Sequence, residues 1–242
     1  MTLAFAGSGI SIDIIFAIAE HLHPRKKKIL ITTTSHLYPP RMFTAPGRCL
    51  PFYLDAYCCL SGSPLDILSL LDSCGICIAG LPETASASRT SLLSSQILPL
   101  PSRVYERVCP FADVVLVKTD SSRGLPLNYP AAQEPLIPSN ADRILIVCDF
   151  SALGKPIGHV AERLIPALSC LNSLAPDSFH PPVTPDTPAD ASLILRLYAQ
   201  GYLRPLRQKF PSKKVQLFPV LRPQNFSLLI PDFCDRIIKC WE

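Results

Sequence analysis

Six short runs of apolar residues recur along the chain, and they limit its possible folds more than any other feature. The runs are rich in Val, Ile and Leu and do not alternate with polar residues, which is typical of strands buried on both faces of a parallel sheet. They are too short to be globular helices. The runs cover residues 3–6, 28–34, 76–79, 112–120, 143–149 and 214–218.

Helical patterns separate several of these runs. Ile10, Ile14, Ile18 and Leu22 follow one another at i+4 spacing, as on the apolar face of a helix. Further helices are expected over residues 157–174, where Pro166 kinks the pattern, after a cap at Thr187, and over residues 232–241. Strands that alternate with helices predict the α/β class, a mostly parallel sheet with helices on both faces.

The domain organisation follows from the absence of a clear linker or internal repeat. We therefore expect a single domain over residues 1–242. Residues 36–66 are rich in proline and aromatic side chains without periodicity, which indicates an irregular excursion from the sheet. Residues 82–101 are expected to form a loop or a short helix, and residues 126–138 an extended loop.

The apolar stretch over residues 3–19 raises the question of a membrane segment. Its basic cluster, residues 25–28, follows the stretch rather than preceding it as in a signal peptide. Asp13 near its centre would cost roughly 2.5–3.5 kcal/mol in a bilayer, and the Gly7-Ser8-Gly9 triplet divides it. A strand, a glycine turn and a helix explain the pattern better, so we expect a soluble protein without a membrane partner.

Charge and cysteine content narrow the function classes. A net charge of +4 without a long basic stripe argues against a nucleic-acid partner. Ten cysteines in 242 residues are too sparse for a small disulfide scaffold, and several lie in apolar runs. We therefore expect a reduced, cytoplasmic compartment.

Polar residues follow the predicted strands where a parallel sheet binds ligands, at the carboxyl ends. A glycine turn that leads into a helix presents free N–H groups to a phosphate, and a strand-end aspartate can hold Mg²⁺. Threonine hydroxyls at a neighbouring strand end could contact phosphate. The residues in these positions are Gly7, Ser8, Gly9, Thr32, Thr33, Thr34, Asp120 and Asp149.

The phosphate loop itself departs from the nucleotide-binding pattern. G-x-x-x-x-G-K-[ST] needs a lysine for the β- and γ-phosphates and a hydroxyl for magnesium. Here the helix opens Ile10-Ser11-Ile12-Asp13, without a lysine and with a carboxylate that would repel phosphate. The alternative interpretation is a tight structural connection between a strand and a helix.

The region after residue 113 carries several motifs in one order. Val117-Lys118-Thr119-Asp120-Ser121 is followed by Leu125-Pro126-Leu127, then Glu134-Pro135-Leu136-Ile137-Pro138, then Ala152-Leu153-Gly154-Lys155-Pro156. These resemble the V-E-A-D-G, L-P-L-K-x-P, E-P-V-I-P and L-D-A-x-G-K-P motifs of the YqeC family, and the threonine run Thr32-Thr33-Thr34 resembles its T-T-T. The resemblance covers roughly residues 3–163.

The resemblance implies a P-loop NTPase-like three-layer sandwich that serves in the maturation of a selenium-dependent molybdenum hydroxylase. It implies ATP or GTP with Mg²⁺ as cofactors, and the hydroxylase or a selenium-handling protein as partner. The family's G-A-G-G-K-T opening aligns with Gly7-Ser8-Gly9-Ile10-Ser11-Ile12, so the lysine falls on Ser11 and the threonine on Ile12. Asp120 is retained as the implied catalytic and Mg²⁺-binding carboxylate, whereas glycine is replaced by Ser121.

The predicted site therefore combines Gly7, Ser8, Gly9 and Ser11 with the threonine run and Asp120. Because the lysine and the threonine are missing, we expect weak or absent hydrolysis, and whether the chain is an enzyme stays open. The alternative is a non-enzymatic scaffold that kept the fold and lost the nucleotide.

Two lysines could replace the missing charge. Lys118 points the same way as Asp120 but about 6.6 Å further back along the strand, so a salt bridge to Asp120 or Asp13 competes with a role at the phosphate. Lys155 follows a strand end on a flexible loop and is the better candidate, although it could equally be a solvent-facing loop residue.

Cys74-Gly75-Ile76-Cys77 is a C-x-x-C motif with Cys58 and Cys59 nearby in sequence. A metal or redox role normally needs a second such motif or a histidine pair at ligand spacing. We favour the interpretation that Cys77 acts as a small apolar residue in a strand, and keep a thiol carrier through Cys74 and Cys77 as a weaker alternative.

Overall fold

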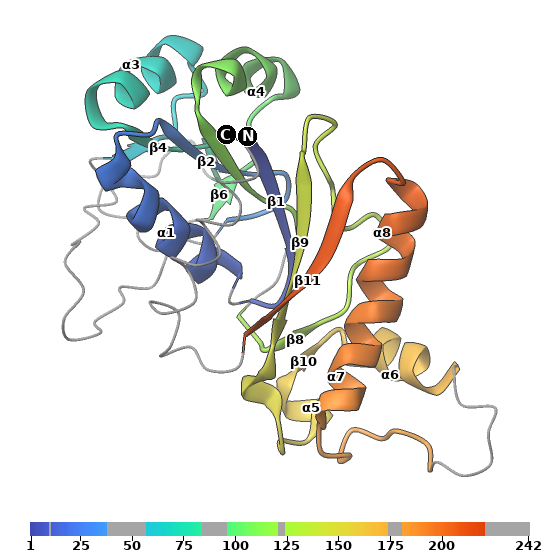
Figure 1. Ribbon diagram of the computed structural model, residues 1–242. Coiled ribbons are helices and arrows are strands. Elements are labelled where there is room, and N and C mark those ends of the chain that lie inside the picture. The colour runs from blue at the N-terminus through green and yellow to red at the C-terminus, as the bar shows by residue number, and fades with distance from the viewer. Residues whose placement is uncertain (10, 38–56, 84–95, 121–123, 174–180, 221–242) are drawn as a thin grey trace, which may run out of the picture.

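A seven-stranded parallel sheet forms the centre of the computed structural model, with the order β11-β9-β1-β7-β2-β4-β3 (Figure 1). The structure describes residues 1–9, 11–37, 57–83, 96–120, 124–173 and 181–220. Every neighbouring pair in this sheet is parallel. Its strands are β1 (Thr2–Gly7), β2 (Ile29–Thr33), β3 (Cys58–Cys59), β4 (Ile76–Ala79), β7 (Val114–Lys118), β9 (Arg143–Asp149) and β11 (Lys214–Val220).

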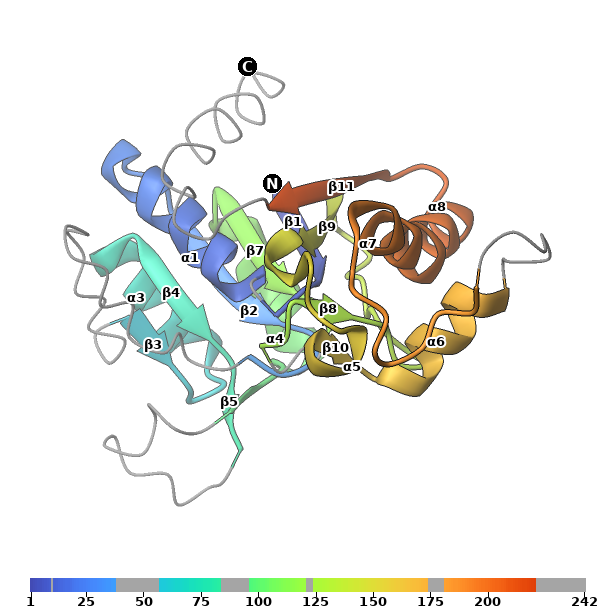
Figure 2. The same cartoon turned by 90° about the horizontal axis from the view of Figure 1, so that it is seen from below.

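Helices cover both faces of the sheet (Figures 1 and 2). The predicted α/β class and the P-loop NTPase-like three-layer arrangement are thus confirmed. The α-helices are α1 (Ser11–Leu22), α3 (Pro64–Cys74), α4 (Ser102–Val108), α5 (Ile157–Val160), α6 (Leu164–Ser173), α7 (Ala191–Tyr198) and α8 (Arg204–Lys209).

Short elements complete the described part of the chain. Two small sheets pair β5 (Leu81–Pro82) with β6 (Ile97–Leu98) and β8 (Leu127–Asn128) with β10 (Ala161–Glu162). A π-helical turn over Ala199–Leu203 joins α7 to α8. Single 3₁₀ turns cover His23–Arg25, Cys109–Phe111 and Phe150–Ala152.

Strand alternation sends the side chains of β1 into two different cores. Leu3 and Phe5 pack with α1 on one face. Ala4 and Ala6 face α7 and its continuation on the other, in a cluster that contains Tyr198 and Tyr202. The small alanines leave room for two fully buried tyrosine rings beside the central strand. A third core lies between α3, α4 and the strands β2, β4 and β7.

Local signals fix the limits of several helices. Pro64 is the first residue of α3, which is capped by the Ser63 hydroxyl and ends at Gly75 with φ +73°. The predicted cap at Thr187 is wrong. Asp190 caps α7 instead, and its Oδ1 accepts a hydrogen bond of 2.7 Å from the Leu193 amide.

The predicted helix over residues 157–174 is divided, though not at its proline. The chain leaves the helical path at β10 and at Arg163, which has φ +55°, and Pro166 then lies within the first turn of α6. A proline is tolerated there because the first amide groups of a helix have no intrahelical acceptor. Part of the irregular excursion and the helix expected over residues 232–241 lie outside the described residues, and the single domain stays a prediction.

Candidate functional site

The carboxyl ends of β1, β7 and β9 form the centre of the candidate site. From β1 the chain passes to β2 on one side, whereas β9 and β11 extend the sheet on the other side. In open α/β sheets such a reversal point leaves a crevice where ligands bind. Gly7, Asp120 and Asp149 stand at the three strand ends.

Asp120 is the centre of a buried hydrogen-bond network. Its side chain is fully buried, and Oδ2 accepts hydrogen bonds from the Gly7 amide at 2.6 Å and the Tyr202 hydroxyl at 3.2 Å. Asn128 Nδ2 lies 3.4 Å from the same oxygen, and Lys118 Nζ lies 3.4 Å from Oδ1. Both carboxylate oxygens are therefore engaged by groups of the protein.

Lys118 forms a salt bridge with Asp120, which is one of the alternatives that the sequence left open for it. It is only 1% exposed, and its ammonium contacts the backbone oxygen of Asp120 as well as the carboxylate. Burial raises the pKa of Asp120, and the charge of Lys118 opposes that rise. Lys118 is thus committed to Asp120.

Tyr202 and Asn128 connect this network to α7 and its continuation. Burial raises the pKa of Tyr202 well above its usual value, which keeps the hydroxyl protonated as a donor to Asp120. Asn128 Nδ2 also donates to the Tyr202 hydroxyl at 3.0 Å and to the Gly7 carbonyl at 3.1 Å. Sequence reasoning missed both residues, because neither belongs to a motif at a strand end of the main sheet.

A surface-facing extension of the network contains the motif glutamate. Arg163 Nη1 donates to Asn128 Oδ1 at 3.0 Å, and its Nη2 pairs with Glu134 Oε2 at 3.1 Å. Glu134 Oε1 accepts from the Ser35 hydroxyl at 3.4 Å. The retained Glu134-Pro135 motif therefore ties the loop after β8 to the end of β2.

The connection between β1 and α1 is already bonded to the protein. The Ser8 amide donates to the Val147 carbonyl at 2.9 Å, and the Gly9 amide donates to the Leu125 carbonyl at 3.2 Å. The backbone of Gly124 lies directly over Gly9, where a Cβ would come within 2.3 Å of the Gly124 Cα. The amides of Ser8 and Gly9, which a phosphate at this turn would need, are thus paired with backbone carbonyls.

Ser11 begins α1 at the position that aligns with the family's lysine. It is fully buried, and its hydroxyl has no hydrogen-bond partner within the described part of the chain. Its amide bonds to the Ser8 carbonyl at 3.0 Å and closes the turn. A serine hydroxyl cannot supply the positive charge that a triphosphate requires.

The threonine run bonds to neighbouring strands and loops. The hydroxyls of Thr32, Thr33 and Thr34 donate to the carbonyls of Ala79, Lys118 and Leu136, at 2.8, 2.9 and 2.6 Å. These bonds cross-link the end of β2 to its surroundings.

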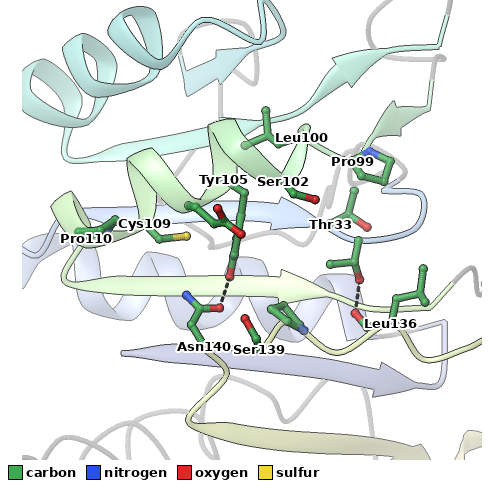
Figure 3. Close-up of a pocket in the computed structure, with 13 residues that line it drawn as sticks. Thr33, Pro99, Leu100, Ser102, Tyr105, Cys109, Pro110, Leu136, Ser139 and Asn140 are labelled. Carbon is green, nitrogen blue, oxygen red and sulfur yellow. Dashed lines mark hydrogen bonds between the residues drawn. The ribbon is translucent and has the colours of Figure 1, made fainter.

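Thr33 and Thr34 also line a cavity of about 570 Å³ on the face of the sheet that carries α4 (Figure 3). Prolines and leucines form much of its wall, and the Tyr105 hydroxyl donates to Asn140 Oδ1 at 2.9 Å inside it. Its lining contains Glu106 and no Lys or Arg among the described residues. A wall of this kind does not suit a triphosphate.

Lys155 lies outside the Asp120 network. It is exposed in the turn between Phe150–Ala152 and α5, where its backbone bonds to Ala152 and Ala189. Asp149, at the end of β9, accepts the Ser151 amide at 2.8 Å. The structure therefore gathers Gly7, Lys118 and Asp120 closely, and leaves Lys155 on the surface.

The residues present do not fit a magnesium nucleotide. The amides of Ser8 and Gly9 are paired, Asp120 is enclosed by four donors, and the lysine required beside the phosphates is missing from the position that aligns with it. Within the described ranges no group of three or more His, Cys, Asp or Glu side chains is placed to hold a metal ion. The same part of the chain contains no helix long and apolar enough to cross a membrane.

Comparison with known proteins supports the family resemblance. The family model described as "YqeC protein" matches residues 3–164, more than half of the chain. An Escherichia coli (strain K12) protein described as "Uncharacterized protein YqeC" is 23% identical over 176 residues, which are 73% of this chain and 62% of that protein. The chain thus spans less than two thirds of that relative's length. On this evidence the chain belongs to the YqeC family.

Proposed function

We propose that this chain is an accessory protein in the maturation of a selenium-dependent molybdenum hydroxylase, and that it works by binding its partner rather than by hydrolysing nucleotide. The family resemblance supports the pathway. The paired amides of Ser8 and Gly9 are the observation that carries the second part of the proposal.

A nucleotide would have to compete for hydrogen-bond donors that the protein already uses. A triphosphate bound at the start of α1 would have to displace the Val147 and Leu125 carbonyls from those amides. It would also have to approach Asp13 and Asp120 without a lysine at position 11 to offset the added charge. Both requirements disfavour nucleotide binding, so the fold serves here as a rigid scaffold for binding the partner.

Ser11 favours a second candidate, a weak anion site kept from the nucleotide-binding form of the family. Its buried hydroxyl lacks a partner in the described part of the chain and lies at the N-terminus of a twelve-residue helix. Under this alternative the chain would still bind ATP or GTP with Mg²⁺, without efficient hydrolysis.

The proposal places the protein in the cytoplasm with a molybdenum hydroxylase or a selenium-handling protein as its partner. The test is affinity purification of the full chain from its host, in parallel with and without enzymatic removal of nucleotides and chelation of Mg²⁺. We expect the same hydroxylase or selenium-handling protein in both samples. Capture that depends on added ATP or GTP with Mg²⁺ would contradict the nucleotide-independent mechanism.

A matched variant sharpens this experiment. The Ser11→Lys/Ile12→Thr double variant restores the residue types of the family's phosphate loop. If partner binding requires the fold but no nucleotide, this variant captures the partner as well as the natural chain does. If partner capture depends on nucleotide only in the variant, the natural loop lost nucleotide binding through these two substitutions. If capture depends on nucleotide in both the natural chain and the variant, the second candidate function is favoured.

A further inference from the structure

The cavity of about 570 Å³ beside α4 is outside the Asp120 network, and nothing in the proposed function uses it. Figure 3 shows side chains of α4, among them Ser102 and Tyr105, on one wall and the loop segment 136–140 on the other. Sites for small molecules have volumes of roughly 300–1,000 Å³. The cavity is therefore large enough for a ligand, and such a ligand does not depend on the proposed function.

The loop wall of the cavity is held in place at both of its ends. The Leu136 carbonyl accepts the Thr34 hydroxyl at 2.6 Å, and Asn140 Oδ1 accepts the Tyr105 hydroxyl at 2.9 Å (Figure 3). The Leu136 amide also donates to the Thr119 carbonyl at 3.0 Å. A wall fixed in this way needs little ordering when a ligand binds, which lowers the entropic cost of binding.

The hydroxyl groups of the lining direct their protons into the protein. Thr33 donates to the Lys118 carbonyl at 2.9 Å, and the protons of Thr34 and Tyr105 are used in the two bonds of the loop wall. Burial raises the pKa of Tyr105, so the phenol keeps its proton. Each hydroxyl oxygen retains lone pairs that can accept. These groups therefore suit a ligand that donates hydrogen bonds.

The charge of the lining points to the same kind of ligand. Glu106 is the one charged residue among the described residues of the lining. Within the described part of the chain no lysine, arginine or histidine forms an ion pair with it. Pro99, Leu100 and Pro138 supply apolar surface beside this carboxylate. The wall thus complements a cation that carries an apolar body.

We propose that the cavity beside α4 binds a small primary amine with an apolar body, whose ammonium group donates to the Glu106 carboxylate and the Tyr105 oxygen. An ammonium group has three N–H donors and no acceptor, which matches a wall of acceptors. The apolar body lies against the prolines and leucines.

The experiment titrates the full-length chain with 4-phenylbutylammonium at pH 7.5 and follows the probe by saturation-transfer NMR. The probes 4-phenylbutan-1-ol and 4-phenylbutanoate have the same body with a neutral and an anionic head. We expect a Kd of about 1 mM or below for the ammonium. The alcohol should bind at least about twofold more weakly and the carboxylate at least about tenfold more weakly. Ammonium binding that is no tighter than that of the alcohol, or no saturation transfer at about 5 mM ammonium, overturns the proposal.

Variants show whether the probe binds in this cavity. Ser102 is exposed on α4, so Ser102→Trp fills the space with an indole ring without disturbing the core, and it should weaken ammonium binding at least tenfold. Ammonium binding that is unchanged in this variant, with circular dichroism as in the natural chain, would place the probe elsewhere and overturn the proposal.

A second variant tests the charge alone. Glu106 is exposed, and Glu106→Gln keeps its shape while it removes the charge, so the ammonium should bind about 2- to 5-fold more weakly and the alcohol as before. Asp186→Asn is the matched control, since this exposed carboxylate lies outside the lining, and it should change neither Kd. Equal effects of Glu106→Gln and Asp186→Asn on the ammonium would contradict a role for Glu106 in binding.

Discussion

The Asp120→Ala substitution tests whether the buried carboxylate after β7 stabilises the folded chain. In the natural chain the carboxylate is fully buried beside Lys118 and accepts the Gly7 amide and the Tyr202 hydroxyl. Removing one partner of a buried ion pair destabilises a protein by about 3–5 kcal/mol, because the remaining charge is left in a poor environment. Lys118 keeps its contact with the backbone oxygen of residue 120, so we expect a loss of about 3 kcal/mol.

The assay is urea unfolding followed by circular dichroism, with thermal unfolding beside it. For a chain of this size, 3 kcal/mol corresponds to a fall in Tm of roughly 6–12 °C. Asp149→Ala is the matched control, since this strand-end carboxylate is also buried but, among the described residues, accepts a single local hydrogen bond, from the Ser151 amide. Its loss should be about 1 kcal/mol, as for a cap.

A double-mutant cycle isolates the ion pair. The Lys118→Met/Asp120→Ala chain removes both charges, so it should be more stable than Asp120→Ala alone. The reasoning is refuted if Asp120→Ala lowers the free energy of unfolding by less than about 1 kcal/mol. It is equally refuted if the loss in the double variant equals the sum of the losses measured in Asp120→Ala and in Lys118→Met alone.

Four further substitutions probe the network and the loop. Tyr202→Phe removes a donor to the buried carboxylate and should cost about 1.5–3 kcal/mol in urea unfolding; a change near zero would mean that the hydroxyl is not needed. Gly9→Ala places a Cβ 2.3 Å from the Gly124 Cα and should destabilise by about 2 kcal/mol or more. Gly124→Ala, which meets nothing within 4 Å but has φ +97°, should cost only about 1 kcal/mol from backbone strain, so equal losses would contradict the close contact. Ser11→Ala removes a buried hydroxyl without a described partner and should raise the unfolding free energy by about 1 kcal/mol; a clear loss would reveal a partner for that hydroxyl.

Periodicity predicted the central sheet well, because both faces of these strands are buried. Arg143–Asp149 forms β9 with the expected limits, and the apolar run that precedes Asp120 forms β7. Alternation also predicted that Lys118 would lie on the same side as Asp120 and could pair with it. These inferences succeed because the period of a strand is fixed by its backbone.

Other features depend on tertiary contacts that no local pattern encodes. Tyr202 reaches Asp120 from a π-helical turn far along the chain, and its partner Asn128 lies in a two-residue strand. The closure of the β1–α1 turn by the Leu125 carbonyl also requires the three-dimensional path of a loop. The motif spacing singled out Asp120 as a candidate, whereas the bonds around it came only from the fold.

Isothermal titration of the full chain with ATP and with GTP, each with Mg²⁺, tests most directly whether the phosphate loop is closed. Because the Ser8 and Gly9 amides are bonded to carbonyls and Asp120 is enclosed, we expect no binding heat at micromolar protein and no turnover. The Ser11→Lys/Ile12→Thr variant should stay equally silent, since the Leu125 and Gly124 backbone still covers the loop. Micromolar binding with turnover by the natural chain, lost in Asp120→Ala while folding is retained, would contradict the account.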